Sequence, residues 1–91
     1  MKKSKRIFLT GSIQDHFFKQ FIKENADRHS VRGFLRKLDD GRVEIFLEGD
    51  HEKVNAMSEI CKRGPLHSNI RKVEERDEHF QDFKEFKIFN F

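Results

Sequence analysis

The sequence predicts an α+β domain in which a five-stranded sheet, antiparallel or mixed, carries two helices on one face. Apolar residues alternate in several strand-length segments and recur at three- or four-residue spacing in two longer ones. The order of these segments is strand, helix, strand, strand, helix, strand, with a further strand at the end. A chain of 91 residues has room for one such domain.

The first half of the chain is predicted to contain a strand, a helix and a β-hairpin. Residues 7–9 are apolar and run into the polar loop 10–12, which is typical of a short strand. Helical spacing begins at Phe17 and ends near His29, with apolar positions at Phe18, Phe21, Ile22 and Ala26. Two alternating segments follow, separated by the turn signal Asp39-Asp40-Gly41. One face of this hairpin carries Val31, Gly33, Leu35, Val43, Ile45 and Leu47.

The second half is predicted to contain a helix and two strands. Asp50 is placed to be the helix N-cap, and the positive φ available to Gly64 together with Pro65 ends the helix. The buried stripe of this helix is Val54, Met57, Ile60 and Cys61. Ile70 and Val73 mark a fourth strand, residues 86–91 a fifth, and the polar residues 74–81 are expected to join them. The whole arrangement is the split β-α-β sandwich of ferredoxin-like folds.

Composition narrows the class of protein. Charged residues make up 38% of the chain and hydrophobic residues 35%, with eleven Phe that enlarge the core. The net charge is +3, and the positive excess lies largely in the first six residues, four of which are basic. We expect residues 1–5 to be a basic, disordered tail before a domain at 6–91. The lone Cys61 permits no intramolecular disulfide and fits a reducing compartment. No apolar run reaches the ~20 residues of a membrane span. We therefore expect a soluble cytoplasmic protein without a membrane partner.

Two motifs in the first half of the chain resemble those of a known protein family. The loop after the first strand reads Gly11-Ser12-Ile13-Gln14-Asp15-His16-Phe17-Phe18-Lys19, and the hairpin reads Gly33-Phe34-Leu35-Arg36-Lys37-Leu38-Asp39-Asp40-Gly41-Arg42-Val43-Glu44. They are similar to the acylphosphatase family, whose loop reads roughly Gly-x-Val-Gln-Gly-Val-x-Phe-Arg and whose hairpin reads Gly-Trp-Val-Arg-Asn-x-x-Asp-Gly-x-Val-Glu. A Gly-Pro pair after the second helix and a Phe-rich last strand are shared as well.

The resemblance implies an activity and a site. Acylphosphatases are hydrolases of carboxyl-phosphate mixed anhydrides and need no metal or cofactor. Their loop presents backbone N–H groups and an Arg to the phosphate, and an Asn at the hairpin turn orients the attacking water. Carried onto this sequence, the catalytic Arg and Asn positions are Lys19 and Lys37. The anion-binding phosphate loop becomes Gln14, Asp15, His16, Phe17 and Phe18.

The substitutions at this site change its chemistry. Lys19 offers one mobile charge where Arg offers a planar fork for two phosphate oxygens. Lys37 carries an ammonium without an acceptor, so it cannot hold a water as an amide does. Asp15 stands where the family has Gly, adding bulk and a negative charge among the N–H groups. Alternatively, Asp15 caps the helix and Lys37 is an ordinary turn residue. Both interpretations predict a degenerate active site.

Other chemically active side chains form no evident site. His16 is a general base or phosphoenzyme nucleophile in one interpretation and a polar loop residue in the favoured one. The other histidines, His29, His51, His67 and His79, lack a metal-binding spacing, so we expect no metal. Cys61 lies on an apolar helix stripe, which favours a buried structural thiol over a nucleophile.

The sheet face opposite the helices offers an alternative function. If Ile7, Leu9, Leu35 and Ile45 face the helices, a period of two turns Phe8, Phe34 and Phe46 to the open face. The arginines that share this face are Arg6, Arg32 and Arg36. Exposed rings and arginines on a sheet are used to stack single-stranded nucleic acid, although Glu44 and Glu48 would repel phosphate.

The sequence therefore predicts an acylphosphatase-like protein with weak or absent activity, acting on an acyl phosphate or another small anion as a monomer or weak dimer. The alternative is a non-enzymatic binding module that uses the open sheet face. Nucleic acid is the less favoured partner, and a structural or dimer-forming Phe patch is the preferred interpretation of that face.

Overall fold

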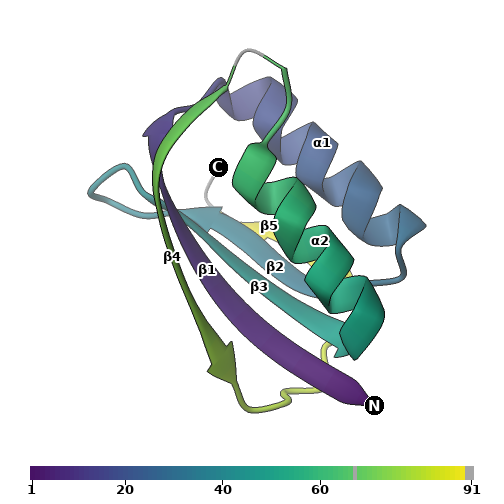
Figure 1. Ribbon diagram of the computed structural model, residues 1–91. Helices are drawn as coiled ribbons and strands as arrows, with labels where there is room; N and C mark the ends of the chain where they lie inside the picture. Colours follow the sequence, from purple (N-terminus) through teal and green to yellow (C-terminus); the bar gives the residue numbers. More distant parts are fainter. Residues whose placement is uncertain (67, 90–91) are drawn as a thin grey trace.

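The computed structural model describes residues 1–66 and 68–89. These residues form a five-stranded sheet with both helices on one face, as predicted (Figure 1). The elements follow in the order β1 (Lys2–Ser12), α1 (Asp15–Arg28), β2 (Arg32–Lys37), β3 (Val43–Asp50), α2 (His51–Arg63), β4 (Asn69–Glu78) and β5 (Phe86–Phe89).

The sheet has the strand order β4-β1-β3-β2-β5. β1 lies antiparallel to both β3 and β4, and β2 lies antiparallel to β3. β5 is parallel to β2, so the sheet is mixed. This is the ferredoxin-like arrangement, in which each helix connects strands that are not neighbours and covers the sheet between them.

The core lies between the helices and the sheet. On α1 the residues Phe18, Ile22 and Ala26 are fully buried at four-residue spacing. On α2 the buried positions are Val54, Met57, Ser58 and Cys61. The sheet contributes the predicted alternating residues, all buried: Ile7, Leu9, Leu35, Val43, Ile45 and Leu47. Asp50 is the N-cap of α2 and Gly64 ends it with a φ of 69°, as predicted.

One glycine shows how closely the sheet is packed. Gly33 has a φ of 136°, and a Cβ placed there would lie 1.8 Å from the carbonyl oxygen of Phe46 on β3. No other residue fits without moving a strand, which explains a glycine within β2.

Three boundaries differ from the predictions. Lys2–Lys5 belong to β1 rather than to a disordered tail, because Lys2 to Lys5 pair with Asp50 to Leu47 of β3. β4 continues to Glu78 through residues predicted to be a connection, since an edge strand paired with β1 can carry charged side chains in solvent. β5 is described to Phe89, and the predicted residues 90–91 lie outside the described part.

Within residues 1–66 and 68–89, neither helix is long and apolar enough to cross a membrane.

Candidate functional site

The loop between β1 and α1 is shaped by a close contact with β4. Pairing of β1 with β4 shifts register between Thr10 and Gly11 and then continues to Ser12, opposite Asn69. A Cβ at Gly11 would lie 2.1 Å from the carbonyl oxygen of Asn69. Gly11 is therefore required for the chain to pass β4 and turn into α1 at this position.

The start of α1 presents backbone N–H groups that make no hydrogen bond within the described residues. Gln14 is the N-cap, with an extended backbone (φ −84°, ψ 102°) and no side-chain capping bond. The first N–H that bonds within the turn is that of Phe18, 2.9 Å from the Gln14 carbonyl oxygen. The preceding N–H groups, at the positive end of the helix dipole, form the kind of place where proteins bind phosphate.

The predicted loop residues are thus mostly helical. Helical spacing was expected to begin at Phe17, but α1 begins at Asp15, so only Gln14 lies before it. Phe18 is fully buried and belongs to the core, whereas the Phe17 side chain is 63% exposed. The predicted alternative that Asp15 caps the helix is wrong, because Gln14 occupies that position.

Two of the three substituted positions contact each other. Lys37, the last residue of β2, places its Nζ 2.8 Å from both carboxylate oxygens of Asp15, the first residue of α1. Their side chains are 34% and 45% exposed, respectively. The sequence gives no direct sign of this contact; the opposite charges at two positions of the family site, one in each motif, were the available signal.

Lys19 differs from Lys37 in its surroundings. It lies on α1, one turn after Asp15, and is partly buried. Within the described residues its ammonium makes no hydrogen bond or ion pair. One lysine of the site is therefore available to an anion, while the other is bound to a carboxylate.

The remaining candidates do not assemble into a second site. His16 is exposed and its ring contacts Phe17 edge-on, with 5.5 Å between ring centres. No group of three or more potential metal ligands occurs in the described residues, from which His67 is missing. Cys61 is buried as predicted, and desolvation raises the pKa of its thiol.

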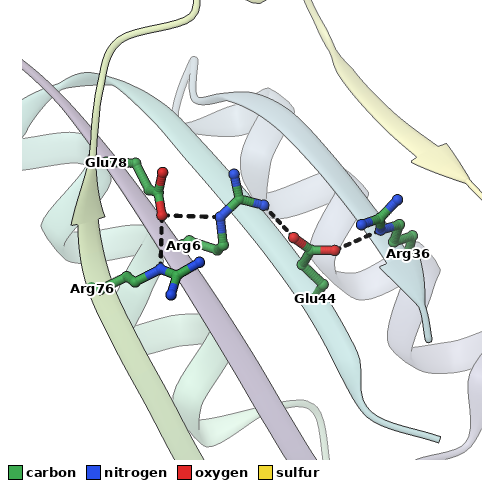
Figure 2. Close-up of polar contacts among 5 residues, drawn as sticks. All are labelled: Arg6, Arg36, Glu44, Arg76 and Glu78. Carbon is green, nitrogen blue, oxygen red and sulfur yellow. Dashed lines mark hydrogen bonds and ion pairs between the residues drawn. The ribbon is translucent and has the colours of Figure 1, made fainter. Parts of the chain in front are cut away.

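The open sheet face is crossed by a chain of ion pairs. Figure 2 shows Arg76 and Arg6 bound to Glu78, and Arg6 and Arg36 bound to Glu44, in a line from β4 across β1 and β3 to β2. The Phe34 and Phe46 rings stack with 5.7 Å between centres, but Phe46 is fully buried. Its ring is 5.4 Å from that of Phe83, which lies in the β4–β5 connection.

Comparison with known proteins gives consistent results. A family model described as acylphosphatase matches residues 5–88. The acylphosphatase of Syntrophobacter fumaroxidans is 35% identical over 88 residues, covering 96% of this chain and 91% of the relative. That of Pyrobaculum arsenaticum is 39% identical over 84 residues, covering 90% and 88%. The crystal structure of acylphosphatase from Bacillus subtilis has a TM-score of 0.88 at 28% identity, covering 98% of this chain and 99% of that one.

Proposed function

We propose that this chain, which belongs to the acylphosphatase family, binds acyl phosphates at the start of α1 but hydrolyses them weakly or not at all. The observation that supports this most directly is the ion pair between Asp15 and Lys37. It occupies the two positions at which the family motifs have a loop glycine and a water-orienting asparagine. We expect the protein to act in the cytoplasm as a monomer or weak dimer.

Binding of the phosphoryl group has two sources of support. The N–H groups at the start of α1 and the positive helix end attract an anion, and Lys19 adds a charge without a competing partner among the described residues. Asp15 opposes them, since its carboxylate lies in the same first turn. The expected result is weak anion binding rather than none.

Hydrolysis depends on a group that holds water in line with the phosphorus atom. A lysine ammonium has three donors and no acceptor, and that of Lys37 already donates to both oxygens of Asp15. It can therefore neither accept a hydrogen bond from water nor orient the oxygen lone pair toward the phosphorus. A misplacement of about 1 Å can lower a rate ~100-fold.

The proposal is tested by hydrolysis of benzoyl phosphate. We expect a rate at least ~100-fold below that of the Bacillus subtilis acylphosphatase measured in parallel. The pair of changes Lys19→Arg and Lys37→Asn should recover part of the rate, and adding Asp15→Gly should recover more. Lys87→Asn, at an exposed position of β5, is the matched control and should change nothing. An unaltered chain as fast as the Bacillus enzyme would refute the proposal.

The alternative role of the open face in binding nucleic acid receives less support. Phe46 has no exposed surface on which a base could stack. Glu44 binds Arg6 and Arg36, and Glu78 also binds Arg6, so much of the positive charge on this face is neutralised. These contacts favour the structural interpretation of the Phe cluster.

A further inference from the structure

A groove of about 350 Å³ lies beside the start of α1. Its walls come from the first turns of α1, with Gln14, Phe17 and Phe21, and from the connection after α2, with Pro65 and Leu66. Figure 1 shows this connection, which leads to β4, passing close to the start of α1. The volume is at the lower end of the range for small-molecule sites.

The groove is lined by large apolar side chains that are exposed to solvent and do not belong to the core. Phe17 is 63% exposed and Leu66 is 86% exposed, whereas the neighbouring Phe18 is fully buried. Exposed large side chains from two separate segments thus meet in one concave surface. Such a concentration is typical of a surface that contacts an apolar ligand group.

The groove borders the first turn of α1, where the proposed anion site lies. Gln14 is the N-cap of α1 and Phe17 lies in its first turn, and both line the groove. In an acyl phosphate, the acyl carbon is two bonds from phosphorus. The acyl group of a ligand whose phosphoryl group rests on the first N–H groups of α1 is therefore close enough to reach this groove past Gln14 and Phe17.

We infer that the groove binds the acyl part of the ligand, so that the chain prefers acyl phosphates with an aryl or larger alkyl group. Contact with Phe17 and Leu66 removes apolar surface from water, which a methyl group does to a much smaller extent. Glu24 also lines the groove, and its carboxylate disfavours acyl groups with a second negative charge. The inference rests on the proposed function for the position of the phosphoryl group.

The test uses two stable phosphonates in which CH₂ replaces the bridging oxygen, phenacylphosphonate and acetonylphosphonate. Affinities are measured by calorimetry for the unaltered protein, Phe17→Ser, Leu66→Ser and the control Phe80→Ser. Phe80 is 43% exposed and does not line the groove. We expect the phenacyl compound to bind about tenfold more tightly to the unaltered protein and the control. The preference should fall below about threefold in the two groove variants, while Leu66→Ser keeps its affinity for inorganic phosphate.

The outcomes separate this inference from the proposed function. Equal affinity for the two phosphonates, or a preference that survives in both groove variants, overturns the inference and leaves anion binding intact. If neither phosphonate nor phosphate binds, the proposed anion site fails, and acetophenone alone then tests the groove. If acetophenone shifts the NMR signals of Phe17 and Leu66, the groove binds an acyl group as inferred. If it shifts neither signal, the inference is overturned. A dimer in sedimentation that Phe17→Ser dissociates also overturns it, because a second copy then fills the groove.

Discussion

The contact between Asp15 and Lys37 joins two departures from the family motifs into one local structure. A lysine at the end of β2 faces the positive end of α1, and the Asp15 carboxylate between them offsets both positive charges. Both side chains remain partly in solvent, so the pair contributes only ~0–1 kcal/mol to stability. Under the proposed function its main consequence is for ligand binding, because the Asp15 carboxylate lies where the phosphoryl group would bind.

Removing the Asp15 carboxylate is expected to strengthen phosphate binding. In Asp15→Asn and Asp15→Gly the N–H groups of α1 and the Lys37 ammonium lose their competing charge. Phosphate should then raise Tm more than it does in the unaltered protein, since a ligand of the folded state adds stability by mass action. The comparison is made in phosphate and in chloride at equal ionic strength.

The matched control for this prediction is Asp27→Asn. Asp27 is also an exposed acid of α1 and is also paired with a lysine, Lys23, but it lies at the other end of the helix. Its removal should leave the effect of phosphate on Tm unchanged. An equal phosphate effect in all variants would show that Asp15 does not compete for the site.

The sequence yields candidate site residues, but it does not predict how they contact one another. Motif spacing places Asp15 in the loop before the first helix and Lys37 at the hairpin turn, and the charge changes follow from residue identity. Their contact depends on the packing of α1 beside β2, which a linear motif does not describe. The groove was missed for the same reason, because Leu66 comes from a segment recognised only as the end of a helix.

At the scale of elements, the buried faces of the helices and the hairpin could be predicted from the sequence. The pairing of strands rich in polar residues could not. The helices and the hairpin carry apolar periodicity, so their existence and core faces were predicted correctly. β4 has few apolar residues and the first residues of β1 are mostly basic, yet both are strands. Their backbone hydrogen bonds come from neighbouring strands, and a partner distant in sequence leaves no local periodicity.

A buried glutamate fixes the β4–β5 connection to the sheet. Glu48 of β3 has no exposed surface, and its carboxylate accepts hydrogen bonds from Ser4 Oγ at 3.0 Å and from two backbone N–H groups of the connection. These are Gln81 N at 2.7 Å and Phe83 N at 2.6 Å. Phe83 is thereby held against the Phe34 and Phe46 rings, which closes part of the open face.

Glu48→Ala is expected to destabilise the protein by at least about 3 kcal/mol. Hydrogen bonds to a charged group contribute ~1.5–3 kcal/mol each, and the change leaves buried donors without an acceptor. Urea unfolding measures the free energy, and proteolysis should cut the connection around residues 79–85 sooner. Glu74→Ala, at an exposed position of β4, should cost under about 0.5 kcal/mol. Equal effects of the two changes would mean that Glu48 does not anchor the connection.

Over the whole molecule, ion pairs link the strands to one another and link β4 to α2. Lys62 of α2 and Lys5 of β1 both bind Glu75 of β4, at 2.9 Å and 3.2 Å, which ties the edge strand to its neighbours. On the opposite face, the ion-pair chain of Figure 2 links β4, β1, β3 and β2. The edge strand, with few apolar contacts, is therefore held partly by charge, which makes its attachment sensitive to pH.

Acid is expected to destabilise the protein below about pH 4.5. Among the described residues, the pKa lies below its ordinary value for several carboxyl groups that accept hydrogen bonds: Asp40 from Arg42, Glu75 from Lys62, Glu78 from Arg6 and Asp82 from Lys84. A group whose pKa is lowered by folding stabilises the folded state above its unfolded pKa, which is near 4.5 for glutamate and 3.8 for aspartate. This stabilisation is lost as the pH falls through the folded pKa.

Tm should therefore drop by several degrees between pH 5 and pH 3, and Glu75→Gln should make that drop smaller. Asp39→Asn, at an exposed position of the hairpin turn, should leave the profile unchanged, and an unaltered protein as stable at pH 3 as at pH 5 would contradict the prediction.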